Sequence, residues 1–181
     1  MRIVETPLPG VLVLEPRVFR DDRGYFLETY RQDRLAELGI GHPFVQANQS
    51  RSVRDTLRGL HWQWRRPQAK LVRVVTGTIF DAVVDLRCGS PTFGKWCGVE
   101  LSAENFRQLY VPAGFAHGFC VTSEVADVEY LCSDYYDHGG EAGLLWSDPA
   151  IGIVWPTECP LLSEKDARNP PLHVTRDDLP G

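Results

Sequence analysis

Glycine and proline interrupt this 181-residue sequence at short intervals, with 16 glycines and 13 prolines in all. The segments between them are rich in Val, Leu, Phe, Tyr and Thr, which favour short strands. The run from 70 to 87, KLVRVVTGTIFDAVVDLR, shows this most clearly, because two strand-like halves flank Thr76, Gly77 and Thr78. We predict a hairpin there. Turns expected at 102–105 and 112–114 continue the pattern, so the chain is predicted to be mainly β, as a sandwich or barrel.

Helix is expected in only a small part of the chain. RQDRLAELG, residues 31–39, has two leucines three apart and a glycine placed to end a helix. From Thr157 onward the sequence is rich in Pro, Asp and Arg, and residues 167–181 are expected to form a loose C-terminal tail. A chain of this length with 43% hydrophobic residues can bury one sizeable core, so residues 1–181 are predicted to form a single domain.

The composition and charge of the chain argue against nucleic acid and membranes as partners. The net charge of -5, with arginines dispersed among acids, argues against a nucleic-acid surface. No run of about 18 apolar residues suggests a membrane span, and the start MRIVETPLPG does not resemble a signal peptide. The five cysteines are odd in number and lack CxxC spacing, so buried free thiols are expected rather than disulfides or a zinc site. We therefore expect a cytoplasmic protein.

Several polar side chains lie within or beside apolar, strand-like segments. The stretch TLRGLHWQ is typical, because it places Arg58 and His61 among leucines and a tryptophan. Buried polar groups cost free energy unless they are paired or used, and alternate residues of a barrel strand face the interior. Each residue alone has a structural explanation, such as a turn, an edge strand or a bonded core group. Together they could converge on one cavity; they are Arg23, Glu28, Gln46, Asn48, Arg58, His61, Lys70, His117 and Tyr130.

Other site chemistries find less support in the sequence. Barrels of this kind often hold a metal with an HxH pair, but here His61 is followed by Trp62 and Gln63, and His117 lacks an obvious partner set. No GxSxG, GxGxxG or P-loop pattern is present. Neither a metal nor a cofactor is therefore expected, and anion binding would depend on arginines.

Seven segments in order, spread over residues 11–166, resemble the dTDP-4-dehydrorhamnose 3,5-epimerase family. They are FRDDRGYFLETY, FVQANQSRS, LRGLHWQ, QAKLVRVVTGTIFDAVVDLR, GSPTFGKW, VPAGFAHGF and LLSEKD. The resemblance implies a cupin-like double-stranded β-helix, or jelly-roll barrel, with few short helices. It also implies a homodimer in which residues 1–30 contribute strands to the interface, and a cofactor-independent reaction on dTDP-4-keto-6-deoxyglucose at C3 and C5.

The resemblance also assigns roles to individual residues. His61 matches the general base, Asp166 the carboxylate that orients it, Tyr130 the general acid and Lys70 the cation beside the substrate ketone. Tyr136 matches the residue that stacks on thymine. The other nucleotide-sugar-binding positions are Arg23, Glu28, Gln46, Asn48, Arg58, His117 and Glu141. Because the N-terminal strands tend to cross to the partner subunit in this family, Arg23 and Glu28 are expected to complete the neighbouring site.

This chemistry suits the residue types. A carbon acid beside a ketone needs a base active near neutral pH, which histidine supplies, and a cation for the enolate oxygen. Inversion needs a proton donor on the opposite face of the sugar. Three alternatives remain open: a mono-epimerase acting at C3 or C5 only, a non-catalytic cupin-like sugar-binding module, and a metal-dependent cupin enzyme.

Overall fold

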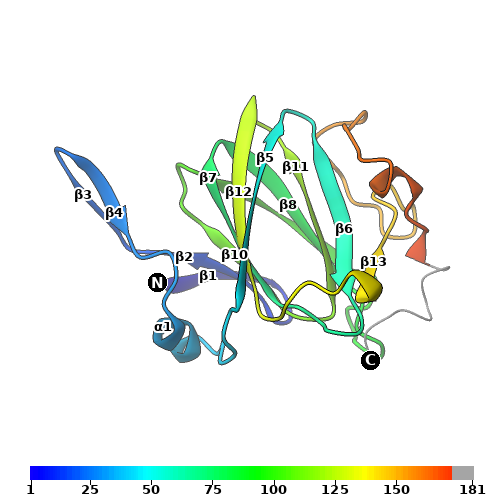
Figure 1. Cartoon of the computed structure of the whole chain (residues 1–181), viewed down its shortest axis with the longest axis horizontal. Coiled ribbons are helices and arrows are strands. Elements are labelled where there is room, and N and C mark those ends of the chain that lie inside the picture. Colours follow the sequence, from blue (N-terminus) through cyan, green and yellow to red (C-terminus); the bar gives the residue numbers. More distant parts are fainter. Residues whose placement is uncertain (173–181) are drawn as a thin grey trace.

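The computed structural model describes residues 1–172, and strands are the predominant element in this part of the chain (Figure 1). Its single α-helix is α1 (Gln32–Glu37), and two 3-10 helices follow late in the chain, η1 (His138–Gly140) and η2 (Asp166–Arg168). The strands are β1 (Arg2–Leu8), β2 (Val11–Glu15), β3 (Val18–Asp21), β4 (Gly24–Leu27), β5 (Gln46–Val53), β6 (Leu57–Gln63), β7 (Lys70–Thr76), β8 (Thr78–Asp85), β9 (Trp96–Ser102), β10 (Gln108–Val111), β11 (Phe115–Val121), β12 (Val125–Cys132) and β13 (Glu141–Gly143). The mainly β class is confirmed.

Two antiparallel sheets form the body of the molecule. One has the strand order β1-β2-β10-β7-β12-β5 and the other has the order β13-β6-β11-β8-β9. The chain passes repeatedly from one sheet to the other, so that neighbouring strands within a sheet are distant in sequence. This is the jelly-roll arrangement that the family resemblance implied, and it confirms the sandwich or barrel expected from the strand pattern.

The main core lies between the two sheets, and one end of the interior is polar. Along β12, Val128, Tyr130 and Cys132 are spaced by two, and they pair with Val74, Val72 and Lys70 of β7. Residues directly opposite in a sheet share a face, so this inward row changes from valines to ionisable groups within a few residues. The apolar part of the row belongs to the core, and its polar end faces the site described below.

The predicted hairpin at residues 70–87 is wrong, although both of its strands exist. β7 pairs with β10 and β12, whereas β8 pairs with β11 and β9 in the other sheet. The chain crosses between the sheets at Gly77, where φ is +78° and a Cβ would lie 2.1 Å from the carbonyl oxygen of Val125. The apolar residues of the two strands thus meet across the core rather than side by side, which a short Thr-Gly-Thr connection cannot indicate.

The helix predicted at 31–39 is confirmed in a shorter form, Gln32–Glu37. Its buried Leu35 packs with Ile40 and Leu14 against the outer face of the six-stranded sheet, and Gly39 follows with φ +89°. No helix in residues 1–172 is long and apolar enough to cross a bilayer.

The C-terminal part that the structure describes is bonded to the body. Leu145 donates its backbone N–H to the carbonyl of Pro170 at 2.9 Å, and Leu172 donates to Asp148 Oδ2 at 2.6 Å. These contacts hold residues 167–172 of the expected tail. Residues 173–181 lie outside the described part of the chain.

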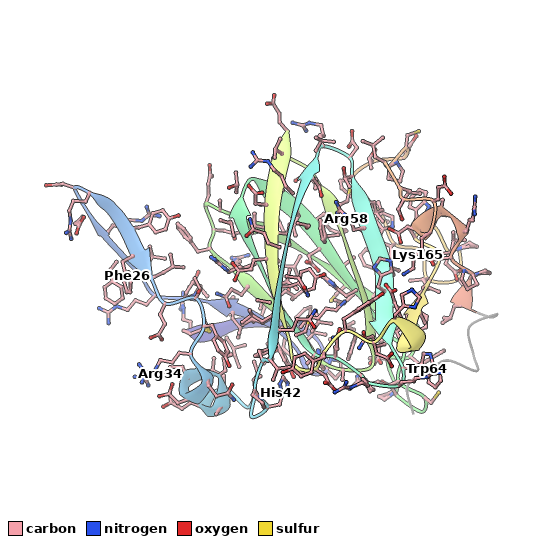
Figure 2. All side chains as sticks on the ribbon, viewed as in Figure 1. Phe26, Arg34, His42, Arg58, Trp64 and Lys165 are labelled. Carbon is pink, nitrogen blue, oxygen red and sulfur yellow. The ribbon has the colours of Figure 1, made fainter. Side chains whose placement is uncertain are left out.

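A separate two-stranded hairpin, β3 with β4, projects from the body beside the N-terminal strands (Figure 1). It carries large exposed side chains, including Phe26 at 69% and Tyr25 at 54% exposed. Figure 2 shows Phe26 on the opposite side of the molecule from Lys165. The hairpin therefore presents apolar surface away from the body.

Candidate active site

A cavity of about 520 Å³ opens at the polar end of the barrel interior. Its walls come from both sheets and from the segment just before η2. The site residues predicted from sequence that line it are Arg58, His61, Lys70, His117, Tyr130, Glu141 and Asp166. Seven of the twelve predicted site residues therefore lie around one cavity.

The stretch TLRGLHWQ forms β6, and its unusual composition has a structural reason. Leu57, Leu60 and Trp62 are buried, whereas Arg58 and His61 line the cavity. Gly59 lies between them with φ +126°, and a Cβ there would come within 2.6 Å of Gly118 Cα on β11. Only glycine fits this close approach, which lets the strand turn both polar side chains toward the cavity.

His61 is paired with a buried carboxylate. Its Nε2 lies 2.6 Å from Asp166 Oδ1, and Asp166 is 4% exposed. Burial opposes ionisation of Asp166, but the hydrogen bond and charge of His61, with the N–H of Gly59 and the Ser163 side chain, hold its pKa below the ordinary value. An ionised Asp166 fixes the proton of His61 on Nε2 and leaves Nδ1 free to accept another.

Lys70 and Tyr130 stand on the opposite sheet from His61. The Lys70 ammonium lies 5.9 Å from the centre of the Tyr130 ring. Burial lowers the pKa of Lys70, against the opposing charges of Cys132, Asp81 and Glu141. Burial also raises the pKa of the Tyr130 phenol, so that this hydroxyl remains protonated and can donate a proton.

Two residues that support the site were missed by sequence reasoning. Asp81 of β8 is fully buried and lies 2.9 Å from His117 Nε2 through its Oδ1. Ser52 Oγ accepts a hydrogen bond from Arg58 Nε at 2.9 Å. An acid inside the apolar run TIFDAVVD was the available signal for Asp81. For Ser52 the signal was its place in the series Asn48, Ser50 and Ser52, whose members are each two residues apart and so share one strand face.

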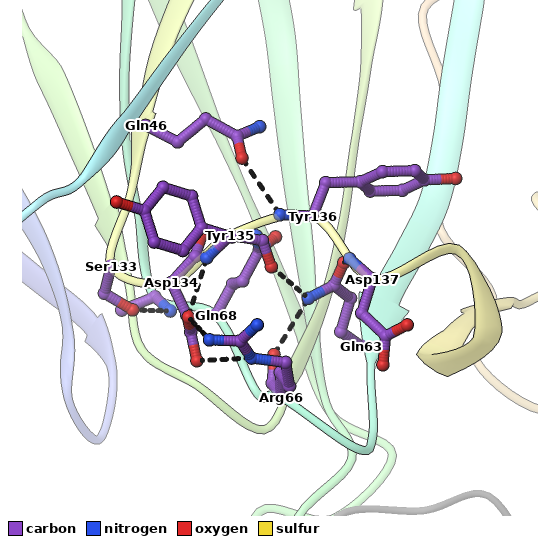
Figure 3. Close-up of polar contacts among 10 residues, drawn as sticks. Gln46, Gln63, Arg66, Gln68, Ser133, Asp134, Tyr135, Tyr136 and Asp137 are labelled. Atoms are coloured by element: carbon purple, nitrogen blue, oxygen red, sulfur yellow. Dashed lines mark hydrogen bonds and ion pairs between the residues drawn. The ribbon is translucent and has the colours of Figure 1, made fainter.

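A smaller adjoining cavity of about 90 Å³ contains the predicted residues Gln46, Asn48 and Tyr136. Gln46 Oε1 accepts from the backbone N–H of Tyr136 at 2.9 Å (Figure 3). The loop that carries Tyr136 is tied further by Gln63, whose Oε1 accepts from the N–H of Asp137 at 2.8 Å. Tyr136 is 51% exposed on this fixed loop, so its ring is available to a planar ligand.

Glu141 connects this loop to the segment that carries Asp166. Glu141 Oε2 accepts from the Tyr136 hydroxyl at 2.8 Å and pairs with Lys165 Nζ at 2.5 Å. Burial opposes ionisation of Glu141, but these two partners hold its pKa below the ordinary value. Lys165, another cavity residue that the sequence prediction missed, thereby joins the two sides of the opening.

Arg23 and Glu28 do not line either cavity of their own chain. Arg23 lies at the tip of the β3–β4 hairpin, where its side chain is 90% exposed and paired with Asp21 at 2.6 Å. Glu28 follows β4 and lies 3.7 Å from Arg31. These two predicted residues are therefore separate from the rest of the set within one chain.

All five cysteines are free thiols, but the expectation that they are buried holds only in part. Cys120 and Cys132 are buried, Cys97 is partly buried, and Cys88 and Cys159 are exposed. Within residues 1–172, no group of three His, Cys, Asp or Glu side chains is arranged to hold a metal ion.

A jelly-roll barrel with a carboxylate-backed imidazole, an enclosed ammonium and a protonated phenol around one cavity defines a cupin-like protein equipped for acid–base chemistry. Comparisons with known proteins identify the family. The sequence model of the dTDP-4-dehydrorhamnose 3,5-epimerase family matches residues 5–173 of this chain. The chain belongs to this family and is an isomerase of the epimerase class.

Individual relatives agree with this assignment. The dTDP-4-dehydrorhamnose 3,5-epimerase of Pseudomonas aeruginosa is 54% identical over 169 residues, which cover 92% of this chain and 93% of that one. That of Neisseria gonorrhoeae is 54% identical over 92% of this chain, which spans about half (51%) of that longer protein. The epimerase from Legionella pneumophila, solved with dTDP-4-keto-L-rhamnose, superposes with a TM-score of 0.96 at 46% identity, covering 99% and 97% of the two chains.

A relative that is named for epimerisation at C3 alone is also similar to this chain. The dTDP-4-dehydrorhamnose 3-epimerase of Streptomyces niveus is 46% identical over 169 residues, covering 92% of this chain and 81% of that one. The relatives of this chain therefore include proteins named as 3-epimerases as well as proteins named as 3,5-epimerases.

Proposed function

We propose that this protein epimerises dTDP-4-keto-6-deoxyglucose at C3 and C5, without a cofactor. One observation carries the proposal: His61 of β6 and Tyr130 of β12 line one cavity from opposite sheets, with Lys70 also in its wall. A base and an acid on opposite walls suit removal of a proton from one face of a sugar and its return to the other.

The proposed reaction begins with proton removal beside the ketone. His61 Nδ1 takes the proton from C5 or C3, and the electron pair of the C–H bond forms the enolate. The Lys70 ammonium stabilises the developing charge on the C4 oxygen, in a cavity where burial strengthens the interaction. Asp166 stabilises the imidazolium that forms.

Inversion follows when Tyr130 donates its hydroxyl proton to the opposite face of the same carbon. The ketone re-forms, the tyrosinate takes a proton from water, and His61 releases the proton it removed. Atoms and charges balance without an oxidant, and two such cycles give inversion at both centres.

The remaining predicted residues are proposed to bind the nucleotide. Arg58, held by Ser52, would face the diphosphate together with His117, whereas Tyr136 would stack on thymine beside Gln46 and Asn48. Glu141 would order the loop between these two regions.

We further propose a cytoplasmic homodimer with a shared site. The exposed aromatic surface of the β3–β4 hairpin and the separation of Arg23 from its own cavity support an exchange in which the hairpin reaches the partner. Five free cysteines are consistent with a reducing compartment.

The test is incubation of the purified protein with dTDP-4-keto-6-deoxyglucose in deuterated water, followed by proton NMR. Deuterium at C3 and C5 with inversion at each is the expected result. Deuterium at one carbon only would favour the mono-epimerase, which the 46% identity to the Streptomyces niveus enzyme supports as a second candidate. Binding without exchange would indicate a sugar-binding module, and activity lost with chelator and restored by metal would indicate a metal-dependent cupin.

His61→Asn provides the residue-level check. It should leave folding nearly intact and abolish exchange, whereas His42→Asn, outside both cavities, should exchange at the wild-type rate. Exchange retained in the His61 variant would refute the assignment of the base.

A further inference from the structure

Strand β5 presents a row of polar side chains on one face. Gln46, Asn48, Ser50 and Ser52 are spaced by two, so they share this face, and the first three line the two cavities. Three members have partners: Gln46 donates to Asn48 Oδ1 at 3.1 Å, and Ser52 accepts from Arg58 at 2.9 Å. The row is thus a bonded set with one exception.

Ser50 is the exception. Its Oγ is shielded from solvent, yet it has no hydrogen-bond partner among residues 1–172, although Ser50 lines the larger cavity. Buried hydroxyl groups are nearly always bonded, because an unpaired one costs free energy. A serine hydroxyl can turn among three staggered positions and can both donate and accept, so it can serve a ligand in the cavity.

The neighbours of Ser50 indicate which part of a ligand it would meet. On one side is Asn48, which pairs across the sheet with Tyr130. On the other is Ser52, which holds Arg58. Ser50 therefore lies between the proposed proton donor for the sugar ring and the proposed cation for the diphosphate.

We propose that Ser50 hydrogen-bonds the hydroxyl group on C2 of the sugar and so selects against 2-deoxy nucleotide sugars, an inference that rests on the proposed function. In a nucleotide sugar the diphosphate is attached at C1, and the reacting carbons are C3 and C5. The C2 hydroxyl is the ring hydroxyl nearest to the diphosphate. It is also unchanged by the reaction, so one contact serves substrate and product alike.

This role differs from a structural one in its effect on stability. Ser50→Ala removes a hydroxyl without a protein partner, so the melting temperature should stay the same or rise. Ser52→Ala is the matched control on the same face, because it deprives Arg58 of a hydrogen bond and should weaken the binding of any nucleotide sugar.

The experiment compares kcat/KM for deuterium exchange with dTDP-4-keto-6-deoxyglucose and its 2-deoxy analogue, dTDP-4-keto-2,6-dideoxyglucose. The wild type should prefer the 2-hydroxy sugar by about 3- to 10-fold, as expected for one neutral hydrogen bond. Ser50→Ala should lose this preference by slowing only with the 2-hydroxy sugar. Ser52→Ala should slow both sugars and keep the preference.

The inference is overturned if Ser50→Ala retains the wild-type preference, or if it slows both sugars equally and melts at a lower temperature. A wild type that exchanges both sugars at the same rate would overturn the role of Ser50 but leave the proposed function intact. A wild type that exchanges neither sugar would overturn the proposed function and this inference with it.

Discussion

Lys70 is a cation enclosed by the cavity, and this position predicts how activity depends on pH. Burial lowers the pKa of Lys70, although carboxylates and a thiol nearby oppose the shift. The protonated form stabilises the enolate, so activity is expected below this pKa and should be lost as the pH rises through it. The loss should occur at a lower pH than an ordinary lysine would give. Initial rates of exchange measured against pH test this.

Lys70→Arg is the variant that isolates the charge. Arginine stays protonated throughout, so this variant should be slower but should keep its activity to higher pH. Lys70→Met should lose roughly 100-fold or more in kcat at all pH values. If the wild type and Lys70→Arg lose activity at the same alkaline pH, the loss is caused by deprotonation of a group other than Lys70.

Tyr130→Phe should separate exchange from inversion. The phenol of Tyr130 stays protonated because burial raises its pKa, so it is suited to donate. Without it, His61 can still remove and return a proton on one face, and deuterium should enter with retention of configuration. The rate of inversion should fall by about 10²- to 10⁴-fold. Tyr135→Phe, in the adjacent loop and 56% exposed, is the control and should invert normally.

At this scale the sequence was most informative where motif and chemistry agree. His61, Lys70, Tyr130 and Asp166 were predicted from family motifs, and the cavity contains all four. Asp81 was missed, because one acid in an apolar strand has no recognisable partner until β8 and β11 are paired. Which residue lies beside a site residue and hydrogen-bonds it depends on the register between strands, and local sequence does not specify that register.

The close approach of β6 and β11 should make Gly59 sensitive to substitution. In Gly59→Ala the Cβ would lie 2.6 Å from Gly118 Cα and 2.9 Å from the His117 carbonyl oxygen, so backbone must move. Because Arg58 and His61 flank this position, both stability and exchange should decrease. Strained backbone costs about 1–3 kcal/mol per residue, to which the clash adds. Urea unfolding and exchange rates measure the two effects.

Gly24→Ala is a control for backbone conformation alone. Gly24 has nearly the same φ, +128°, but no atom lies within 4 Å of a Cβ built there. Gly24→Ala should therefore reduce the free energy of unfolding only by the cost of the strained backbone, without the added cost of a clash. Equal losses in the two variants would show that the approach of β6 to β11 is not the cause.

The connection at Gly77 shows what a strand pattern leaves undetermined. The two halves of the run 70–87 were correctly predicted as strands and are β7 and β8, because alternation and β-branched residues are local properties. Their pairing was predicted incorrectly, since a three-residue link with a glycine suits either a hairpin or a crossing between sheets. The choice depends on β10, β11 and β12, which pair with these strands from distant parts of the chain.

At the scale of the whole molecule, the predicted site residues of one chain lie in two separate places. Most of it surrounds the cavity, whereas Arg23 lies on the projecting β3–β4 hairpin beside exposed Tyr25 and Phe26 (Figures 1 and 2). Desolvating this apolar surface against a second subunit would stabilise a dimer. In that assembly each site would combine the barrel of one chain with the hairpin of the other.

Mixed dimers of two impaired variants test this arrangement. Arg23→Ala should lower kcat/KM by about 10- to 100-fold through loss of a charge-assisted contact, and His61→Asn should be inactive. If Arg23 serves the partner's site, each mixed dimer has one site with both changes and one site with neither. Equal co-expression should then restore about a quarter of wild-type activity, because half of the dimers are mixed and half of their sites are intact. If Arg23 serves its own chain, every site carries one change and the activity stays at the average of the two variants. Native mass spectrometry of the same samples measures the fraction of mixed dimers. If mixed dimers are abundant and activity is still not restored, the shared site is contradicted.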